Sequence, residues 1–332
     1  MTGAAAVIPN WNRRDLLVGL LERLPEQTRR FAEVLVVDNA SEDGSPEAAA
    51  RLGARVIRLE ANRGFAAAVN RGVAASRAGY VAVINNDVEL EPDWLERLAE
   101  ALEADSSRWF ATGKILLSHD RSTLDGAFDL LSRGGCAWRA GHGRKDSAAW
   151  RQSRPVRAAP LTAALLRRSL FDRVGLLDER LESYLEDVDF GLRCACAGCE
   201  GVFVPEARAY HRHSATLGRW HPDTVRRIAR NQLLLVAKHY PDGWLARFGW
   251  PVLVGQALWC ALAFRHGAGW ASLRGKCEGL RRFRAARREN EGQRRRAAVP
   301  AAAVIEASEA ELLALQKTGG LDWYWRMYFG LT

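Results

Sequence analysis

Two aspartates end short apolar runs in the first part of this 332-residue chain. Asp38 closes the run Val34-Leu-Val-Val, and Asp87 closes the run Tyr80-Val-Ala-Val-Ile-Asn-Asn. Such runs predict buried parallel strands, and ligands of open parallel sheets bind beyond the carboxyl ends of the strands. Either aspartate could instead cap the turn that follows it. Because two separate strands would bring these acids to one edge, the pair favours a binding site.

A glycine-containing segment between these aspartates could approach a phosphate group. The residues Asn62, Arg63 and Gly64 open a predicted helix, and a glycine there lets the backbone come close to a ligand. No G-x-G-x-x-G motif follows the first predicted strand, and the chain has no G-x-x-x-x-G-K-[ST] loop. An oxidoreductase that binds a dinucleotide therefore ranks low.

Three acids and a histidine in the second half could carry out proton transfer or bind a cation. Glu186, Asp187 and Asp189 begin a predicted helix, where acids could simply complement the helix dipole. The preceding Tyr184-Leu pair would help to bury a carboxylate, which favours a chemical role. His211 follows a short predicted strand, and a lone histidine is more often structural than a ligand.

The elements that must position these residues alternate between strand and helix. Apolar or β-branched runs predict strands at 4–9, 34–38, 55–59 and 80–85. Helical patterns between them predict helices at 13–23, 46–52, 65–76 and 92–103. This alternation predicts an α/β fold whose mainly parallel sheet is flanked by helices on both faces. A glycine- and arginine-rich stretch at 125–160 predicts loops or hairpins.

The order of these motifs resembles the inverting glycosyltransferases of family two, in particular the rhamnosyltransferase-like members. The resemblance runs from Ala4 to about Tyr240 and implies the GT-A nucleotide-sugar fold, which is Rossmann-like. Residues 1–118 would bind the nucleotide sugar, and residues 119–240 would form the acceptor-binding and catalytic half. The motifs that carry it are Val-Val-Asp38-Asn, Asn62-x-Gly-Phe-Ala, Asn85-x-Asp87, Glu186-Asp187-Val-Asp and Tyr210-His211.

Carried over position by position, the resemblance implies a role for each matching residue. Asp187 would be the general base, and Asp87 with His211 would bind Mg²⁺ or Mn²⁺. Thr162 and Glu186 would line the acceptor and sugar pocket. The family often has Asp-x-Asp where this chain has Asn85-Asn86-Asp87, so one carboxylate of the expected metal site is missing. The residues implied to bind the nucleotide sugar are Pro9, Asn10, Asp38, Asn62, Arg63, Asn85 and Asn86.

The resemblance implies an inverting hexosyltransferase that moves a sugar, with rhamnose as the implied one, from a nucleotide diphosphate sugar to a glycan or lipid-linked hydroxyl. Such an enzyme would serve the biosynthesis of cell-envelope polysaccharides. Residues 1–8 have no basic cluster before an apolar stretch, so we expect a cytoplasmic protein. Two alternatives stay open. One is a nucleotidyltransferase on a similar fold, and the other is a basic protein that binds membranes or nucleic acid without catalysis.

The basic surplus of the chain belongs to its C-terminal region. The net charge is +9, and residues 265–296 hold eleven Lys or Arg against three Glu, which is +8 of that total. Because the first 264 residues are nearly neutral, we expect no nucleic-acid partner. A basic helix could still bind nucleic acid, and the apolar run described next could be a buried core helix.

Apolar and aromatic residues accompany this charge. Residues 248–264 contain no charged side chain, and a stripe of four apolar residues at helical spacing follows among the arginines. We therefore expect residues 241–332 to form a helical, basic extension that lies on an anionic membrane surface, at the inner face of the cell membrane. The aromatic tail could add an anchor or close back over the catalytic domain. The stripe consists of Leu273, Cys277, Leu280 and Phe283; the tail aromatics are Trp323, Tyr324, Trp325, Tyr328 and Phe329.

Overall fold

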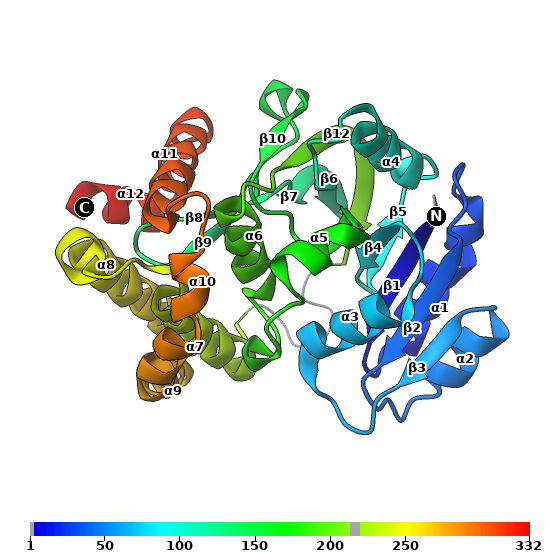
Figure 1. Cartoon of the computed structure of the whole chain (residues 1–332), viewed down its shortest axis with the longest axis horizontal. Helices are drawn as coiled ribbons and strands as arrows, with labels where there is room; N and C mark the ends of the chain where they lie inside the picture. The colour runs from blue at the N-terminus through cyan, green and yellow to red at the C-terminus, as the bar shows by residue number, and fades with distance from the viewer. Residues whose placement is uncertain (1–2, 213–219) are drawn as a thin grey trace. The chain divides into compact units, whose positions relative to one another are not determined.

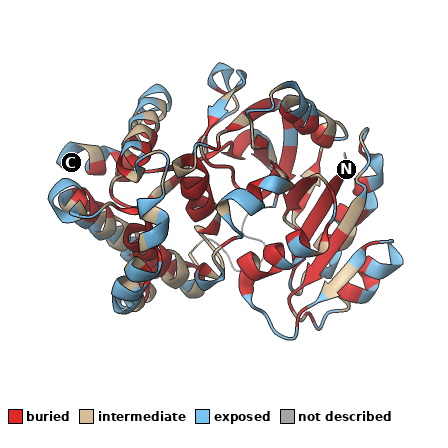
Figure 2. Ribbon diagram, in the orientation of Figure 1, coloured by how far each residue is buried: buried red, intermediate tan, exposed pale blue. Residues whose placement is uncertain are grey.

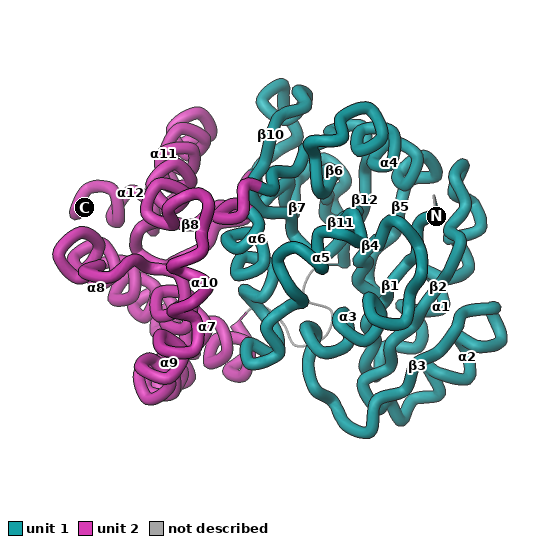
Figure 3. Tube along the Cα trace, in the orientation of Figure 1, with its two compact units in different colours: residues 1–128, 141–194, 199–216 teal, residues 129–140, 195–198, 217–332 magenta. Residues whose placement is uncertain are grey.

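The computed structural model describes residues 3–212 and 220–332, and the chain forms two compact units (Figure 3). The first unit comprises residues 1–128, 141–194 and 199–216, and the second comprises 129–140, 195–198 and 217–332. These units are defined by packing. The predicted boundaries after residues 118 and 240 divide the chain by function instead, so they stay a prediction.

One mixed sheet of ten strands dominates the described part of the first unit (Figure 1). The strand order is β10-β12-β6-β11-β4-β1-β2-β3, with β5 paired to β12 and β7 paired to β6. Strands β4, β1, β2 and β3 are parallel neighbours, and β12 is parallel to β6. The strands are β1 (Ala4–Asn10), β2 (Glu33–Asp38), β3 (Arg55–Arg58), β4 (Tyr80–Ile84), β5 (Val88–Leu90), β6 (Phe110–Leu117), β7 (Asp120–Gly126), β10 (Arg154–Val156), β11 (Ala163–Arg167) and β12 (Gly201–His211).

Helices between the strands complete the expected α/β fold, which the structure confirms. The four predicted strands and four predicted helices are present, with ends displaced by two residues or fewer. The stretch at 125–160 contains short strands, among them the hairpin of β8 (Asp129–Leu131) and β9 (Ala137–Arg139) in the second unit. The helices of the first unit are α1 (Arg14–Arg23), α2 (Ser45–Arg51), α3 (Gly64–Ala75), α4 (Trp94–Ala104), α5 (Arg168–Val174) and α6 (Glu186–Cys196), which ends in a residue of the second unit.

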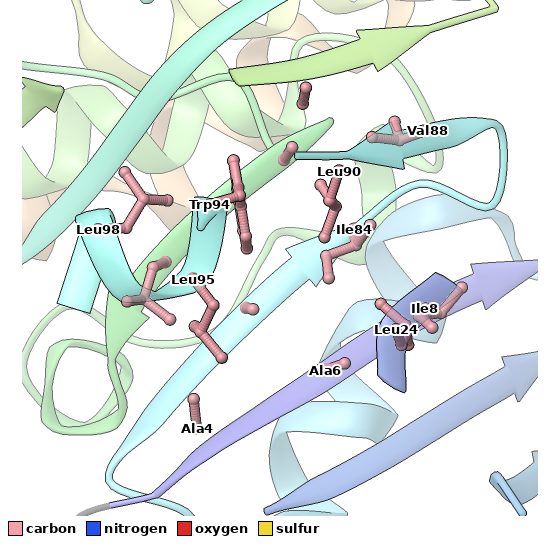
Figure 4. Packing of buried hydrophobic residues seen from close by; sticks show 14 of the residues in the cluster. Ala4, Ala6, Ile8, Leu24, Ile84, Val88, Leu90, Trp94, Leu95 and Leu98 are labelled. Atoms are coloured by element: carbon pink, nitrogen blue, oxygen red, sulfur yellow. The ribbon is translucent and has the colours of Figure 1, made fainter. Parts of the chain in front are cut away.

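Apolar layers on both faces of the sheet hold its central strands in place. Strand β1 is buried along its whole length, as Figure 2 shows, because each of its faces is covered. Helix α4 has apolar residues at helical spacing, Leu95, Leu98 and Leu102, and these are fully buried. They share one layer with Ile8 of β1 and Ile84 of β4 (Figure 4). The strand ends beyond this rigid layer are therefore well fixed.

The described part of the second unit is helical apart from the β8–β9 hairpin, which agrees with the expected C-terminal extension. Helix α9 packs closely on α7 through its small residues. A Cβ atom on Gly275 would lie 2.1 Å from the carbonyl oxygen of Arg226, so only glycine allows this approach. Its helices are α7 (Pro222–His239), α8 (Trp244–Arg265), α9 (Gly269–Glu289), α10 (Glu291–Arg295), α11 (Ala301–Gly319) and α12 (Trp323–Leu331).

The aromatic tail corrects one expectation. Tyr324, Trp325 and Tyr328 of α12 are buried within the second unit and do not form an exposed anchor. The Tyr324 hydroxyl donates to the Gly255 carbonyl oxygen at 2.9 Å, and the Tyr328 hydroxyl donates to Glu309 at 2.8 Å. Buried tyrosines need such partners for their hydroxyl groups, and α8 and α11 supply them. Three of the five tail aromatics are thus core residues.

Candidate active site

The carboxyl ends of β4, β1 and β2 bring three predicted site residues into one hydrogen-bonded row. Asn86 Nδ2 donates to Asn10 Oδ1 at 2.7 Å, and Asn10 Nδ2 donates to Asp38 Oδ1 at 3.3 Å. Asp38 is fully buried, and its second oxygen accepts a hydrogen bond from the Ser41 backbone N–H at 2.9 Å. Because these strands are parallel neighbours, their carboxyl ends share one edge of the sheet. Pro9 precedes this row and is buried within β1.

The start of α3 lies beside this row, and its side chains are already engaged. Asn62 Oδ1 accepts from the Gly64 N–H at 3.0 Å, and Asn39 Oδ1 accepts from the Arg63 N–H at 3.2 Å. The Arg63 guanidinium is 67% exposed and lies 3.4 Å from Glu179. Asn62 therefore has a local structural role in this structure. That Asn62 and Arg63 contact a nucleotide stays a prediction.

Two carboxylates from distant parts of the chain meet the buried side chain of His211. Asp87 lies between β4 and β5, and His211 ends β12, which pairs with β5. The His211 Nε2 atom is 3.2 Å from Asp87 Oδ1, and its Nδ1 atom is 2.8 Å from Asp125 Oδ2. Asp125 belongs to β7 and is fully buried. The imidazole thus stands between two carboxylates.

These carboxylates control the charge of His211. Burial by itself disfavours the imidazolium, but the hydrogen bond to Asp125 and the nearby carboxylate of Asp87 outweigh it and raise the pKa of His211 to about 9. Without a cation, the ring is therefore protonated at neutral pH. A bound divalent cation would have to displace that proton, since a metal-binding histidine is neutral.

The residues at the end of β4 fit a divalent cation that the substrate helps to hold. Asn85 Oδ1 and Asp87 Oδ1 are buried oxygens that accept no well-aligned hydrogen bond, although Asp87 Oδ1 is close to His211. In the described part of the chain, no three His, Cys, Asp or Glu side chains form a preassembled cation site. Mg²⁺ is commonly held by one or two carboxylates together with substrate phosphates. Asp87 and His211 are compatible with that kind of site.

The acids at the start of α6 have different surroundings. Asp189 is fully buried and forms an ion pair with Arg193, whose Nε lies 3.1 Å from Asp189 Oδ2. Arg193 also donates to the Val174 carbonyl oxygen at 2.6 Å. Asp187 is only partly buried, and its Oδ1 accepts from the Val188 N–H at 2.9 Å. Asp189 is therefore committed to packing, whereas Asp187 and the buried Glu186 remain candidates for chemistry.

The loop before α6 has an unfavourable backbone conformation. Glu182, Tyr184 and Leu185 have φ values of 62°, 72° and 67°, a region that costs a non-glycine residue about 1–2 kcal/mol. Such strain persists only where surrounding contacts hold it. Because this loop leads directly into Glu186 and Asp187, its contacts decide where the candidate base lies.

Helix α3 supplies those contacts. The Ala66 N–H donates to the Glu182 carbonyl oxygen at 3.0 Å, and the Phe65 N–H donates to Ser183 Oγ at 3.2 Å. Gly64 has a φ of +87°, and a Cβ atom there would lie 2.7 Å from the Glu182 carbonyl oxygen. The glycine motif at the start of α3 therefore packs against the backbone of the loop that precedes α6.

Sequence reasoning missed two functional candidates, Asp125 and Asn70, and it predicted Thr162, whose backbone lies beside the end of β4. Asp125 lies in the stretch expected to be loops and hairpins, and no spacing distinguishes it there. Asn70 lies eight residues after Asn62 in α3. Its side chain bonds the backbone of Leu177, and helical periodicity does not reveal so distant a partner. Thr162 is buried, and its carbonyl oxygen accepts from the Asn85 N–H at 2.9 Å, beside the end of β4.

Comparison with known sequences gives a consistent result. Residues 5–175 match the family model described as glycosyl transferase family 2. The chain is 32% identical over 265 residues to the N-acetylglucosaminyl-diphospho-decaprenol L-rhamnosyltransferase of Mycobacterium tuberculosis, which covers 72% of this chain and 85% of that protein. It is 30% identical over 224 residues to the O-antigen biosynthesis protein RfbC of Myxococcus xanthus, which covers 63% of this chain and 17% of that protein.

Solved structures share the fold. GalNAc-T7 with UDP, GalNAc and Mn²⁺ has a TM-score of 0.61 at 14% identity, covering 90% of this chain and 59% of that chain. The mannosyltransferase PcManGT of Pyrobaculum calidifontis, in complex with GDP-Man and Mn²⁺, has a TM-score of 0.51 at 18% identity. That alignment covers 99% of this chain and 87% of the other. At such low identities the likeness establishes the fold alone.

Proposed function

Because this chain belongs to glycosyl transferase family 2, we propose that it transfers a hexose from a nucleotide diphosphate sugar to a hydroxyl group, with inversion at the anomeric carbon. Family membership makes it a glycosyltransferase with the GT-A fold; the donor, the inversion and the metal are the proposed parts. The observation that carries the proposal is the Asp87–His211 pair. Asp87 directly follows Asn86, the first member of the Asn86–Asn10–Asp38 row.

Asp87 and His211 would hold a Mg²⁺ or Mn²⁺ ion together with the donor phosphates. When bound, such an ion is a Lewis acid that neutralises the charge developing on the leaving nucleoside diphosphate. Asp38 and Asn10 would line the nucleoside pocket, with Asp38 accepting from a ring N–H of the base. The row of hydrogen bonds supports this assignment because it fixes both side chains before the donor arrives.

Asp187 would act as the general base. As the acceptor oxygen forms its bond to the anomeric carbon, the carboxylate takes the hydroxyl proton, and the nucleoside diphosphate leaves from the opposite face with the electron pair. The Asp189–Arg193 ion pair supports this choice because it removes one of the three acids from consideration. Glu186 is next in line, and Thr162 and Glu186 would line the acceptor and sugar pocket.

The acceptor would be a lipid-linked glycan and the sugar L-rhamnose. The name of the Mycobacterium tuberculosis relative states both a rhamnosyl transfer and an N-acetylglucosaminyl-diphospho-decaprenol substrate. The alignment covers 85% of that relative, which supports proposing the same donor sugar and acceptor class for this chain. An acceptor of this kind lies in a membrane, so the enzyme would have to work at a membrane surface.

Exposed apolar side chains of the second unit support attachment to a membrane. Of the thirteen large hydrophobic side chains that are exposed in the described chain, ten belong to this unit. On α9, three of the four residues of the expected apolar stripe, Leu273, Cys277 and Leu280, are exposed because the glycine face of the helix packs on α7. Leu280 is 62% exposed, Leu273 is 38% exposed, and Trp270 at the start of the helix is 80% exposed.

Charge and length add to this argument. Exposed arginines flank the apolar stripe of α9, which fits a peripheral helix on anionic lipid. Helix α8 is long and apolar enough to cross a membrane by length and composition, which is weak support, since core helices can meet the same test. We infer attachment at the inner face of the cell membrane. The exposed arginines of α9 are Arg274, Arg281, Arg282, Arg284 and Arg288.

The decisive experiment offers the full chain a panel of nucleotide sugars with Mn²⁺ and a synthetic prenyl-diphosphate-linked N-acetylglucosamine. Rhamnosyl product by mass spectrometry, with release of nucleoside diphosphate, is the expected result. Release of pyrophosphate would favour the nucleotidyltransferase alternative. A donor that stabilises the protein against heat only with Mn²⁺ would identify the nucleotide. No product from any sugar in the panel would contradict the proposed reaction.

A further inference from the structure

We propose that Asp125 is a positioning residue, which fixes the tautomer and the ring orientation of His211 so that Nε2 faces the cation beside Asp87. This inference rests on the proposed function, because it takes His211 to be a metal ligand. It adds a residue that neither the motifs nor the family match assigns.

A β-bulge delivers the Asp125 carboxylate to His211. On β6, Leu116 and Ile115 are consecutive, but their partners on β7 are Leu124 and Gly126. Asp125 is therefore the extra residue of the bulged strand. Bulges redirect a side chain out of the regular alternation of a strand, and they occur often beside active sites. Asp125 Oδ2 consequently lies 2.8 Å from His211 Nδ1, although 86 positions separate the two residues.

The chemistry of a histidine ligand explains what this contact does. A neutral imidazole has one N–H group and one lone pair, and only the nitrogen with the lone pair can bind a cation. By accepting the Nδ1 proton, Asp125 leaves the lone pair on Nε2, the atom that lies 3.2 Å from Asp87. Carboxylate partners of this kind orient metal-binding histidines and increase their basicity. Without Asp125, the ring is free to rotate or to adopt the neutral tautomer that carries its proton on Nε2.

His142 restrains Asp125 from the other side. Its Nδ1 atom lies 3.0 Å from the Asp125 carbonyl oxygen and 3.4 Å from Asp125 Oδ1. The carboxylate is fully buried between the two histidines, so it has little freedom to adopt another position. A cation bound at Asp87 would therefore meet an imidazole whose direction is already set.

The test measures Mn²⁺ affinity, by electron paramagnetic resonance of free Mn²⁺, for the full chain alone and with UDP, GDP or thymidine diphosphate in turn. Asp125→Asn and Asp125→Ala should weaken Mn²⁺ binding by about 10- to 100-fold, as loss of such partners typically does. Asp146→Asn is the matched control, because it weakens the part-buried ion pair with Lys114 at 2.8 Å without touching His211. This control should lower the melting temperature and leave Mn²⁺ affinity unchanged.

The outcomes separate the two hypotheses. If His211→Ala weakens Mn²⁺ binding but both Asp125 variants bind like wild type, Asp125 has no positioning role and the metal site stands. If wild type binds no Mn²⁺ even with the nucleotide, the proposed metal site and this inference both fail. Should the Asp125 variants not fold, ¹⁵N resonances of the histidines in the wild-type Mg²⁺ complex decide the question. The expected state has the proton on Nδ1 of His211, and a deprotonated Nδ1 would overturn the inference.

Discussion

Asn70 holds Leu177 by both backbone groups, although 107 positions separate the two residues. Asn70 Nδ2 donates to the Leu177 carbonyl oxygen at 2.9 Å, and Asn70 Oδ1 accepts from the Leu177 N–H at 2.9 Å. Asn70 is in α3, and Leu177 begins the segment that leads through Glu182 to the start of α6. The side-chain amide thus replaces a strand partner for Leu177, which lies just before the 3₁₀ turn of Glu179–Leu181.

Asn70→Ala should loosen this segment and misplace Asp187. It leaves two buried backbone groups of Leu177 without their partner, which costs about 1–3 kcal/mol each. We expect a lower melting temperature and a fall in kcat of about tenfold. Donor binding should stay close to normal, because the residues of the nucleotide row, Asn10, Asp38 and Asn86, do not contact Leu177. Asn290→Ala, which removes a hydrogen bond to Ala286 within the second unit, is the control and should spare kcat. Equal loss of kcat in both variants would mean that only stability matters.

Removal of the metal should stop transfer. In excess chelator the rate should fall by at least about 100-fold and return with Mn²⁺ or Mg²⁺, since Lewis-acid stabilisation is worth several kcal/mol. Asp87→Ala should give the same loss without recovery, while its circular dichroism spectrum and melting curve remain those of a folded protein. Unchanged turnover in chelator would refute the role of Asp87 and His211 as ligands but not the fold.

Asp187→Asn should separate binding from chemistry. The amide keeps the shape and the hydrogen-bonding capacity but loses the basicity, so transfer should slow by about 10²–10⁴ while the donor binds normally. Asp189→Asn should act differently. It breaks a buried ion pair with Arg193, so the free energy of unfolding should fall by about 3–5 kcal/mol. If Asp187→Asn retains more than about a tenth of wild-type transfer, Glu186 becomes the candidate base.

Membrane attachment should depend on the exposed face of α9. The full chain should sediment with phosphatidylglycerol vesicles and far less with phosphatidylcholine vesicles, and high salt should release it only in part. Trp270→Ser and Leu280→Ser should each weaken binding by about tenfold or more, because burying a large apolar side chain contributes about 1.5–3 kcal/mol. Leu176→Ser is the control, since Leu176 is 43% exposed but belongs to the first unit. Equal sedimentation of all three variants and wild type would exclude this face.

The pH dependence of stability should reveal Lys276. Its ammonium group lies 2.6 Å from Gln232 Oε1 and also contacts Gln256, and burial lowers the pKa of Lys276 to about 8 from its usual 10.5. Between these two values the unfolded chain binds more protons than the folded one, so stability rises with pH. The melting temperature of wild type relative to Lys276→Met should therefore increase from pH 8 to 10.5 and stay flat below 8. A flat difference throughout would show an ordinary pKa.

Local pattern was enough to predict the parallel part of the sheet and the strand ends that bear Asp38 and Asp87. In a strand every second side chain lies on the same face, and in a helix every third or fourth does. These spacings are local, so they can be recognised in the sequence. The parallel arrangement follows from the alternation of strand and helix. Asp38 and Asp87 could therefore be assigned to one edge from the pattern, whereas Asn10 and Asn86 were implied only by the family resemblance.

Tertiary structure alone decided which of two faces of α9 is buried and which partners the distant polar residues meet. Periodicity indicated an apolar stripe, but only the close approach of α7 at Gly275 decided that the glycine face is buried and that Leu273 and Leu280 stay exposed. The burial of Tyr328 and the meeting of Asp125 with His211 are likewise long-range contacts. A bulge or a helix contact of this kind depends on the spatial order of strands and helices, which no local window of sequence contains.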